Sequence, residues 1–408
     1  MRSDQLVATM QSTRPARRAM PPRRLPLWQR MWRRRWVRGA LAACAVVLVW
    51  LTWSVGSYLT APGGDSVAAR LAEWARDHGF APVVVTLEKW QYDLHPPKVG
   101  GAPPPISAPS VAQSVAPSTS QQQAQKASAQ ALTIAMRPPM TTPVQPALPH
   151  EGQWTTLVQV KGQPAVQAAY VRPDASHTSY LTGVVWLSHK LLKFNLHPGF
   201  SQPGGTWTVP DWIPPSQRRG LVATWNGAFK LADAHGGFYL DGKTAGTLTS
   251  GAASEVFYKD GSMTIGSWNK EVHMASNVVG VRQNLTLLID NGKIAPNIDS
   301  DPQINWGLTL GGRYYIFRSG VGITAQGDLV YASGDALSAG TLADILKRAG
   351  AVRAMELDIN PAWVSFMSYQ AGNNPNNPTP QLLLHDYQRP ADRYYTTTSR
   401  DFVSVYAR

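Results

Sequence analysis

The longest apolar stretch of the chain lies near its N-terminus and predicts one membrane-spanning helix. It runs from Gly39 to Leu59 without a charged side chain, and roughly 20 apolar residues are enough to cross the hydrocarbon layer as a helix. A cleaved signal peptide is the alternative, but its apolar core usually has only about 7–15 residues. The length therefore favours an uncleaved transmembrane helix at residues 39–60. Aromatic side chains typical of the two membrane interfaces flank or end it: Trp28, Trp32, Trp36, Trp53 and Tyr58.

From residue 151 onward, short apolar segments alternate with turn signals, a pattern typical of β-strands. Two hairpins are predicted at residues 258–265 and 287–294, where Asp-Gly and Asn-Gly pairs favour tight turns. The C-terminal domain, residues 151–408, is therefore expected to be rich in β-sheet. The other predicted strands are 154–160, 167–172, 183–187, 190–195, 220–225, 237–240 and 256–258.

One helix is predicted in this domain, at residues 341–350, between two strand-like segments at 328–332 and 352–357. Thr341 begins a sequence that resembles a capping box, and Gly350 is a typical helix stop. Strand, helix and strand at this spacing predict a βαβ crossover whose second strand is buried. The expected fold class is α+β, with a mixed β-sheet and one such crossover, preceded by the transmembrane helix and a linker.

Two stretches of different composition lie between the apolar span and the domain. Residues 61–95 are predicted to hold a helix that starts at Ser66 and stops near Gly79, followed by a short strand at 83–87. Residues 96–150 are rich in Pro, Ser, Ala and Gln and hold few aromatic or charged side chains. Such a stretch buries too little apolar area to offset its ordering entropy. We predict a disordered linker there, extended in part by its prolines.

The net charge of +13 comes largely from the first 38 residues, which form a basic tail. Arginine excess directly before an apolar span is a topology signal that keeps this side of the membrane cytoplasmic. The predicted location is therefore the cell membrane, with one span, a cytoplasmic N-terminus and an extracellular C-terminal domain. The remaining sequence is close to balanced in charge, so a nucleic-acid partner is not expected. The arginines of the tail are Arg2, Arg14, Arg17, Arg18, Arg23, Arg24, Arg30, Arg33, Arg34, Arg35 and Arg38, beside one acid, Asp4.

The single cysteine, Cys44, lies in the predicted span, which excludes several kinds of chemistry from the outer domain. Neither a disulfide, nor a cysteine-based zinc site, nor a thiol nucleophile can form there. The outer sequence also lacks GxSxG and HExxH motifs, a Walker loop and a GxGxxG motif. Serine-hydrolase and zinc-protease chemistry therefore lack their usual marks, and no nucleotide cofactor is expected.

The segment from Ala354 to Trp363 carries the most informative polar residues. On a strand, Glu356, Asp358 and Asn360 alternate to one side, and three such groups at a strand end are costly unless satisfied or used. Two residue steps separate the carboxylates by roughly 7 Å, which is compatible with glycoside hydrolysis by paired carboxylates. Asp358 with its neighbours can instead hold Ca²⁺ or another divalent cation. An ordinary polar face at a sheet edge is the third alternative.

Two further segments carry polar groups that follow predicted strands. Asn226, Lys230 and His235 offer an amide, a cation and an imidazole within ten residues, although each alone is common in turns or on surfaces. Arg318 ends a predicted strand and can direct its guanidinium at a phosphate or a carboxylate of a ligand. Pairing with a carboxylate of the core is the alternative for this arginine.

These segments resemble, in the same order, motifs of the phosphodiester glycosidase family. The family's Asn-Gly-Gly-Phe-Phe element corresponds to Asn226-Gly-Ala-Phe-Lys230, and its Arg-Thr/Ser-x-x-Gly element corresponds to Arg318-Ser-Gly-Val-Gly322. Its Gly-x-Thr-Leu helix and the following Leu-Asp-Gly-Gly-Gly-Ser correspond to Ala339-Gly-Thr-Leu342 and Leu357-Asp-Ile-Asn360. The resemblance spans about residues 181–367, most of the outer domain.

The chain departs from the family pattern around Asp358. Ile359 and Asn360 stand in place of glycines, which adds bulk where a close approach to substrate is expected, and Glu356 stands where the family more often has Asn. The resemblance implies an α+β fold with a central mixed sheet. It also implies a site, containing Arg318 and Asp358, that cleaves a sugar-1-phosphodiester outside the cytoplasm with a bound divalent ion.

We therefore expect a membrane-anchored hydrolase that cleaves a sugar-1-phosphodiester in cell-envelope glycans, with a carbohydrate or phosphoglycan substrate. Arg318, together with Lys230, is expected to hold the phosphodiester. Glu356 and Asp358 are the candidates for base or nucleophile and for acid or metal ligand. Two alternatives stay open: a catalytically inactive glycan-binding module and a structural cell-envelope protein. The other substrate-binding candidates are Asn226, Asn360 and His235.

Overall fold

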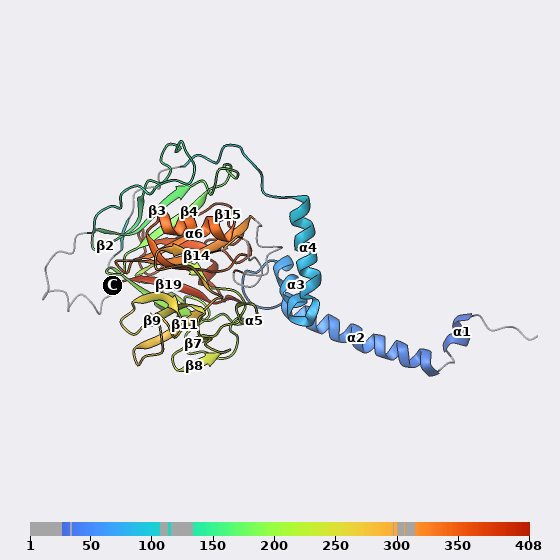
Figure 1. Cartoon of the computed structure of the whole chain (residues 1–408). Coiled ribbons are helices and arrows are strands. Elements are labelled where there is room, and N and C mark those ends of the chain that lie inside the picture. The colour runs from blue at the N-terminus through green and yellow to red at the C-terminus, as the bar shows by residue number, and fades with distance from the viewer. Residues whose placement is uncertain are drawn as a thin grey trace, which may run out of the picture. The chain divides into compact units, whose positions relative to one another are not determined.

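The chain consists of two compact units, Met1–Thr60 and Ala61–Arg408 (Figure 1). The computed structural model describes residues 27–32, 35–106, 113–115, 134–296, 298–299, 306 and 315–408.

The first unit holds the predicted apolar helix. A short helix, α1 (Leu27–Trp32), precedes a long one, α2 (Arg35–Leu59). Within α2, residues Trp36–Leu59 are long and apolar enough to cross a membrane. A signal sequence near the N-terminus can meet the same criteria of length and composition, and the side of the membrane that each end faces stays a prediction.

The second unit begins with the helix that was expected after Ser66. This helix, α3 (Val67–Ala75), is capped by Ser66, whose side chain accepts a hydrogen bond from the backbone N–H of Ala69 at 3.2 Å. A π-helical turn, η1 (Arg76–Phe80), follows, and in it Gly79 has a φ of +84°. The predicted stop at this glycine is therefore confirmed as a break, because only glycine adopts this conformation without strain.

The strand predicted at residues 83–87 is wrong, because these residues belong to a second helix, α4 (Ala81–Leu94). A short apolar run alone does not distinguish a strand from a helix. Pro82 stands in the first turn of α4, where its fixed φ suits a helix start and its missing N–H costs nothing.

Three β-sheets form the body of this unit, and the largest is a mixed sheet. All neighbouring strands in it run antiparallel except β1 and β2. Its order is β1 (Gln113–Val115), β2 (Thr155–Val160), β3 (Gln163–Val171), β4 (Thr182–Leu187), β15 (Leu329–Leu337), β14 (Ile316–Thr324), β16 (Ala351–Glu356), β12 (Leu287–Asp290) and β13 (Lys293–Ile294).

The two other sheets are antiparallel throughout. One has the order β10 (Met263–Ser267), β9 (Ala253–Tyr258), β11 (Val278–Gln283), β7 (Phe238–Leu240) and β8 (Lys243–Ala245). The other has the order β18 (Thr379–Leu382), β17 (Phe366–Gln370), β6 (Leu221–Asn226), β19 (Phe402–Ala407) and β5 (Leu192–His197). Short helical turns lie between strands: α5 (Leu231–Ala234), η4 (Pro215–Gln217) and η5 (Arg393–Tyr395).

The predicted strand–helix–strand crossover is present, and it spans one intervening strand. Both β15 and β16 pair antiparallel with β14, so they run parallel to each other. Helix α6 (Ala339–Arg348) connects them and packs over this part of the sheet (Figure 1). Its N-cap is Ser338, three residues before the predicted Thr341, whose backbone N–H it binds at 3.0 Å. The predicted α+β fold class is confirmed.

Apolar side chains cover both faces of the large sheet. On one face, Val184, Val330 and Ala354 pack with Leu342 and Leu346 of α6. On the other, the alternating positions pack against the two smaller sheets, as alternation along a strand requires. The residues of this second layer include Val185, Val321, Met355, Trp225, Phe194, Phe257 and Ile265.

The predicted linker, 96–150, lies only partly within the described residues. Residues 134–150 have no helix or strand but contact the domain, where Met140 and Val144 are buried. Arg137 lies over the rings of Trp154 and Trp186, with its Cζ 5.7 and 5.3 Å from their centroids. These contacts extend the folded domain toward residue 134.

Candidate active site

Three segments chosen from the sequence meet at the end of β16. Gly320 of β14 pairs with Glu356, and the hydrogen bonds continue past the regular strand. Leu357 N donates to Ser319 O at 2.8 Å, and Ser319 N donates to Asp358 O at 3.1 Å. The backbone at Leu357 and Asp358 therefore stays hydrogen-bonded to β14 beyond Glu356, the last residue of β16.

Asn226 reaches this point from β6 through Ser319. The Asn226 amide donates to Ser319 Oγ at 2.9 Å, and Ser319 Oγ donates to Asp358 O at 2.8 Å. Asn226 Oδ1 accepts hydrogen bonds from Ser365 N and Tyr331 Oη, each at 3.0 Å. The buried amide of Asn226 is therefore satisfied. Through Ser319, Asn226 holds the backbone carbonyl of Asp358 in place.

Arg318 and Glu356 form an ion pair inside the sheet. Their Nη1 and Oε1 atoms are 2.5 Å apart, and both side chains are 1% exposed. Arg318 Nε also donates to Leu337 O at 2.9 Å. Burial raises the pKa of Glu356 to about 7, although the charge of Arg318 opposes this shift. Of the two partners left open for Arg318, the structure shows the core carboxylate.

Asp358 has a different electrostatic environment from Glu356, because Arg400 acts on it. Burial raises the pKa of its carboxyl group, and Arg400 and the backbone N–H of Asn360 act in the opposite direction. Asp358 Oδ1 accepts the Asn360 N–H at 2.9 Å. The two carboxylates thus have different surroundings. Glu356 pairs with the fully buried Arg318, whereas the charges of Arg400 and of Glu73 in α3 act on Asp358.

Lys230 stands on a loop that a buried ion pair supports. Arg282 Nε lies 2.7 Å from Asp401 Oδ2, and Arg282 also donates to Phe229 O. Asp401 O accepts the Gly227 N–H at 2.9 Å, and a Cβ on Gly227 would come within 2.1 Å of Asp401 Oδ2. The Asn-Gly pair is therefore needed for this close approach, which fixes the loop that presents Lys230.

A group of arginines that the sequence analysis did not select surrounds Trp363. The Cζ atoms of Arg389, Arg393 and Arg400 lie 4.6, 5.5 and 5.0 Å from the centroid of its ring. Arg393 donates to Trp363 O and Ser365 Oγ at 2.7 and 2.9 Å. The available signal was three arginines among aromatic and polar residues in the neutral segment before β19.

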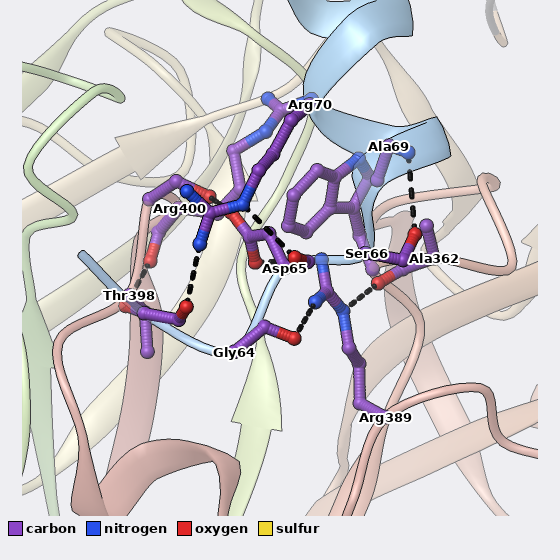
Figure 2. A network of polar contacts seen from close by, with 12 residues as sticks. Gly64, Asp65, Ser66, Ala69, Arg70, Ala362, Arg389, Thr398 and Arg400 are labelled. Carbon is purple, nitrogen blue, oxygen red and sulfur yellow. Dashed lines mark hydrogen bonds and ion pairs between the residues drawn. The ribbon is translucent and has the colours of Figure 1, made fainter. Parts of the chain in front are cut away.

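Acidic residues of the membrane-proximal segment, residues 61–95, contact these cations. Lys230 Nζ lies 2.5 Å from Glu73 Oε2 and 2.7 Å from Asp77 Oδ1. Figure 2 shows Arg389 reaching Gly64 and Ala362, and it donates to their carbonyls at 2.7 Å each. The sequence left open whether this segment touches the domain, and the structure shows that it does.

Two predicted binding residues have other surroundings. His235 is exposed at the end of α5, in a left-handed conformation with a φ of +50°. Asn360 is half-buried, and its side-chain oxygen accepts the Ala362 N–H at 2.9 Å, which fixes the turn after Asp358. Ile359, the other departure from the family pattern, packs against Phe229 of the Lys230 loop.

The divalent cation expected at Asp358 stays a prediction. Among the described residues, no group of three or more His, Cys, Asp and Glu side chains could hold one. Arg400 is instead the counter-charge that lowers the pKa of this carboxyl group. Hard cations need several oxygen ligands, so we assign no step to a metal.

Comparisons with known proteins bear on the central part of the domain. Residues 219–358 match the family model described as phosphodiester glycosidase. This match confirms the resemblance expected from the sequence and indicates a hydrolase of this kind. A search of curated proteins gives no match.

Three solved structures of low sequence identity are also similar to this chain. The catalytic domain of zebrafish N-acetylglucosamine-1-phosphodiester alpha-N-acetylglucosaminidase, auto-inhibited by its pro-peptide, is 15% identical, with a TM-score of 0.38 over 60% of this chain and 82% of that one. A hypothetical protein from Synechocystis is 11% identical, with a TM-score of 0.34 over 61% and 63%. A protein of Burkholderia pseudomallei described as exported is 12% identical, with a TM-score of 0.31 over 56% and 74%.

Proposed function

We propose that this chain, which carries a domain of the phosphodiester glycosidase family at residues 219–358, is a membrane-anchored hydrolase of sugar-1-phosphodiesters in the cell envelope. The observation that carries the proposal is the surroundings of Asp358. This buried carboxylate follows β16, two residues after the buried acid Glu356, and the charge of Arg400 acts on it. A carboxylate beside cations is the arrangement that cleavage of an anionic glycoside needs.

In this reaction, water or a carboxylate attacks the sugar C1 while the bond from C1 to the phosphate oxygen breaks. The leaving group is a phosphomonoester anion, so cations assist its departure more than a proton donor does. We assign Asp358 as base or nucleophile, because the positive charge of Arg400 acts on its carboxyl group and favours the ionised form. Glu356 can take up or release a proton near neutral pH, since its pKa is about 7.

Arg318 acts through Glu356 in this proposal. Its guanidinium is 1% exposed and already binds Glu356 Oε1 and Leu337 O. It therefore positions Glu356 and stabilises the end of β16. Binding of the phosphate is assigned to other cations. Asn226 has a similar role, because it holds the backbone of Asp358 through Ser319.

The test measures sugar release from a panel of sugar-1-phosphodiesters by the full chain in detergent, with Ca²⁺, with Mg²⁺ and with a chelator. We expect turnover in all three conditions and a loss of about 10²–10⁴-fold in kcat for Asp358→Asn. Asp344→Asn is the matched control, because Asp344 is an exposed acid on α6 that pairs with Arg348.

Two results would contradict the proposal in different ways. Turnover that the chelator abolishes would show a metal-dependent reaction. No turnover over a broad panel by a folded chain would favour the alternative of an inactive glycan-binding module.

A further inference from the structure

Three cations of the domain come from separate loops and share partners: Lys230 and Arg400 both contact Glu73, and Arg389 and Arg400 both lie over the ring of Trp363. Lys230 precedes α5, Arg389 follows β18, and Arg400 precedes β19, and all three side chains are buried. Burial and the neighbouring charge of Arg393 lower the pKa of Arg389 to about 10. Like charges gathered out of water destabilise a fold unless an anion compensates them. This cluster of Lys230, Arg389 and Arg400, the cationic cluster, therefore calls for negative charge.

Among the described residues, the direct ion pairs of this cluster are with the membrane-proximal segment, while Asp358, Asp401 and Asp233 also act on Arg400. Besides the pairs of Lys230, Arg389 Nη2 lies 2.7 Å from Asp65 Oδ1, and Arg400 Nη2 lies 3.2 Å from Glu73 Oε1. Figure 2 shows Gly64 and Asp65 beside Arg389. Three carboxylates of one short segment, Asp65, Glu73 and Asp77, thus compensate cations of three loops.

The segment is held mainly by these charges. Several of its large apolar side chains are exposed: Val67 is 64% exposed, Leu71 40% and Phe80 47%, whereas Trp74 is half-buried and Val84 is buried. Apolar burial is the dominant stabilising term when two surfaces pack, and here it is small. A segment with few buried apolar contacts opens locally at low cost, so an anion in solution can compete with its carboxylates.

The cationic cluster is also incompletely satisfied. Among the described residues, Nε and Nη1 of the buried Arg400 have no hydrogen-bond partner. A guanidinium offers a planar fork of donors that suits a phosphate. The charge of Arg400 also acts on Asp358, the carboxylate proposed for the chemistry, and lowers its pKa against the effect of burial.

We propose that Lys230, Arg389 and Arg400 form the subsite for the phosphate group of the ligand, and that Asp65, Glu73 and Asp77 occupy it until an anion displaces them. This inference rests on the proposed function for the identity of the ligand, a phosphodiester. Its recognition chemistry is independent of turnover, because the cluster binds the diester anion whether or not the bond to the sugar breaks.

The test measures binding of dimethyl phosphate, a diester anion without a sugar, to the full chain in detergent by calorimetry. Glu73→Gln removes one competing carboxylate and should lower the Kd roughly tenfold, because a larger share of the chain has a free subsite. Glu88→Gln is the matched control: it removes one carboxylate of the same segment, whose partner is Arg76 rather than the cluster. The Kd of this control should equal that of the unaltered chain.

Arg400→Gln should raise the Kd by about 10-fold or more, since it removes a charged hydrogen-bond donor. Arg400→Lys keeps the charge and should bind more tightly than Arg400→Gln. Hydrogen exchange gives a second measurement that needs no variant: saturating dimethyl phosphate should speed exchange of the α3 amides and leave those of α6 unchanged.

The outcomes separate this inference from the proposed function. Equal Kd values for Glu73→Gln and Glu88→Gln, or α3 exchange that the anion does not change, would overturn the subsite even if the chain hydrolyses its substrate. Tighter binding by Glu73→Gln without turnover on any phosphodiester would support the subsite while the proposed hydrolase fails.

Discussion

Two sets of ion pairs lie within the same site and differ in what surrounds them. Arg318 and Glu356 come from neighbouring strands of one sheet, and both side chains are 1% exposed. Lys230 and Arg389 instead pair with Glu73 and Asp65, acids of a segment that precedes the domain, whose side chains are 11% and 13% exposed. The first pair can separate only if the sheet opens, whereas the second set can separate when one short segment moves.

This difference indicates which charges are available for a ligand. A sealed pair fixes the backbone and tunes a neighbouring carboxyl group, because neither member can exchange its partner. A pair between a domain and a separate segment can exchange an internal carboxylate for an external anion. Each prediction below tests one side of this comparison.

The largest expected effect is the loss of the sealed pair. Arg318→Met leaves Glu356 buried without its counter-charge and should lower the free energy of unfolding by about 3–5 kcal/mol. Urea denaturation of the full chain in detergent measures this change. The double variant Arg318→Met/Glu356→Leu, which removes both charges, should recover most of the loss. A single variant as stable as the unaltered chain would show that the pair is not sealed.

The sequence predicted the sealed part of the site better than the exchangeable part. Asn226 ends β6, Arg318 lies near the start of β14 and Asp358 follows β16, so all three lie at or near strand ends, where the strand-like sequence pattern could indicate them. The arginines at 389, 393 and 400 lie in irregular segments, where no periodicity predicts a direction. Their common partner, Trp363, is defined only by the fold.

The membrane-proximal segment shows the same limit from the other side. Its first helix was predicted from Ser66, but the apolar run at 83–87 fits a strand and a helix equally well, and Pro82 decides between them. Asp77 contacts Lys230 and Glu73 contacts Arg400, and the two residues of each pair are more than 150 positions apart in the sequence. Pairing over such separations is set by tertiary structure and leaves no local pattern.

A second prediction uses the titration of Glu356 to test the sealed pair. Its pKa is about 7 in the folded chain against an ordinary value of 4.5, so the folded state binds an additional proton between these values. The free energy of unfolding should therefore fall as the pH rises from about 4.5 to about 7, by on the order of 1–3 kcal/mol. Urea denaturation across this range measures the slope.

Glu356→Gln supplies the control for this slope. The variant cannot titrate at this position, so its stability should change less over the same pH range. Glu255, whose pKa burial raises to about 8, contributes to both curves and cancels in their difference. Parallel curves would mean that Glu356 is ionised throughout, held by Arg318.

The smallest expected effect concerns an ion pair that is neither sealed nor shared with the segment. Asp344 and Arg348 lie four positions apart on α6, with N and O atoms 2.6 Å apart and side chains 42% and 30% exposed. Exposed pairs of this kind contribute only about 0.3–0.5 kcal/mol. Asp344→Ala should therefore lower the free energy of unfolding by no more than about 0.5 kcal/mol, an amount that salt reduces further.

Asp65→Asn, in a more sheltered pair, should lower the free energy of unfolding more than Asp344→Ala and less than Arg318→Met. If the Asp65 and Asp344 variants instead cost the same, charge would contribute little to docking the segment, and the contrast between sealed and exchangeable pairs would need another cause.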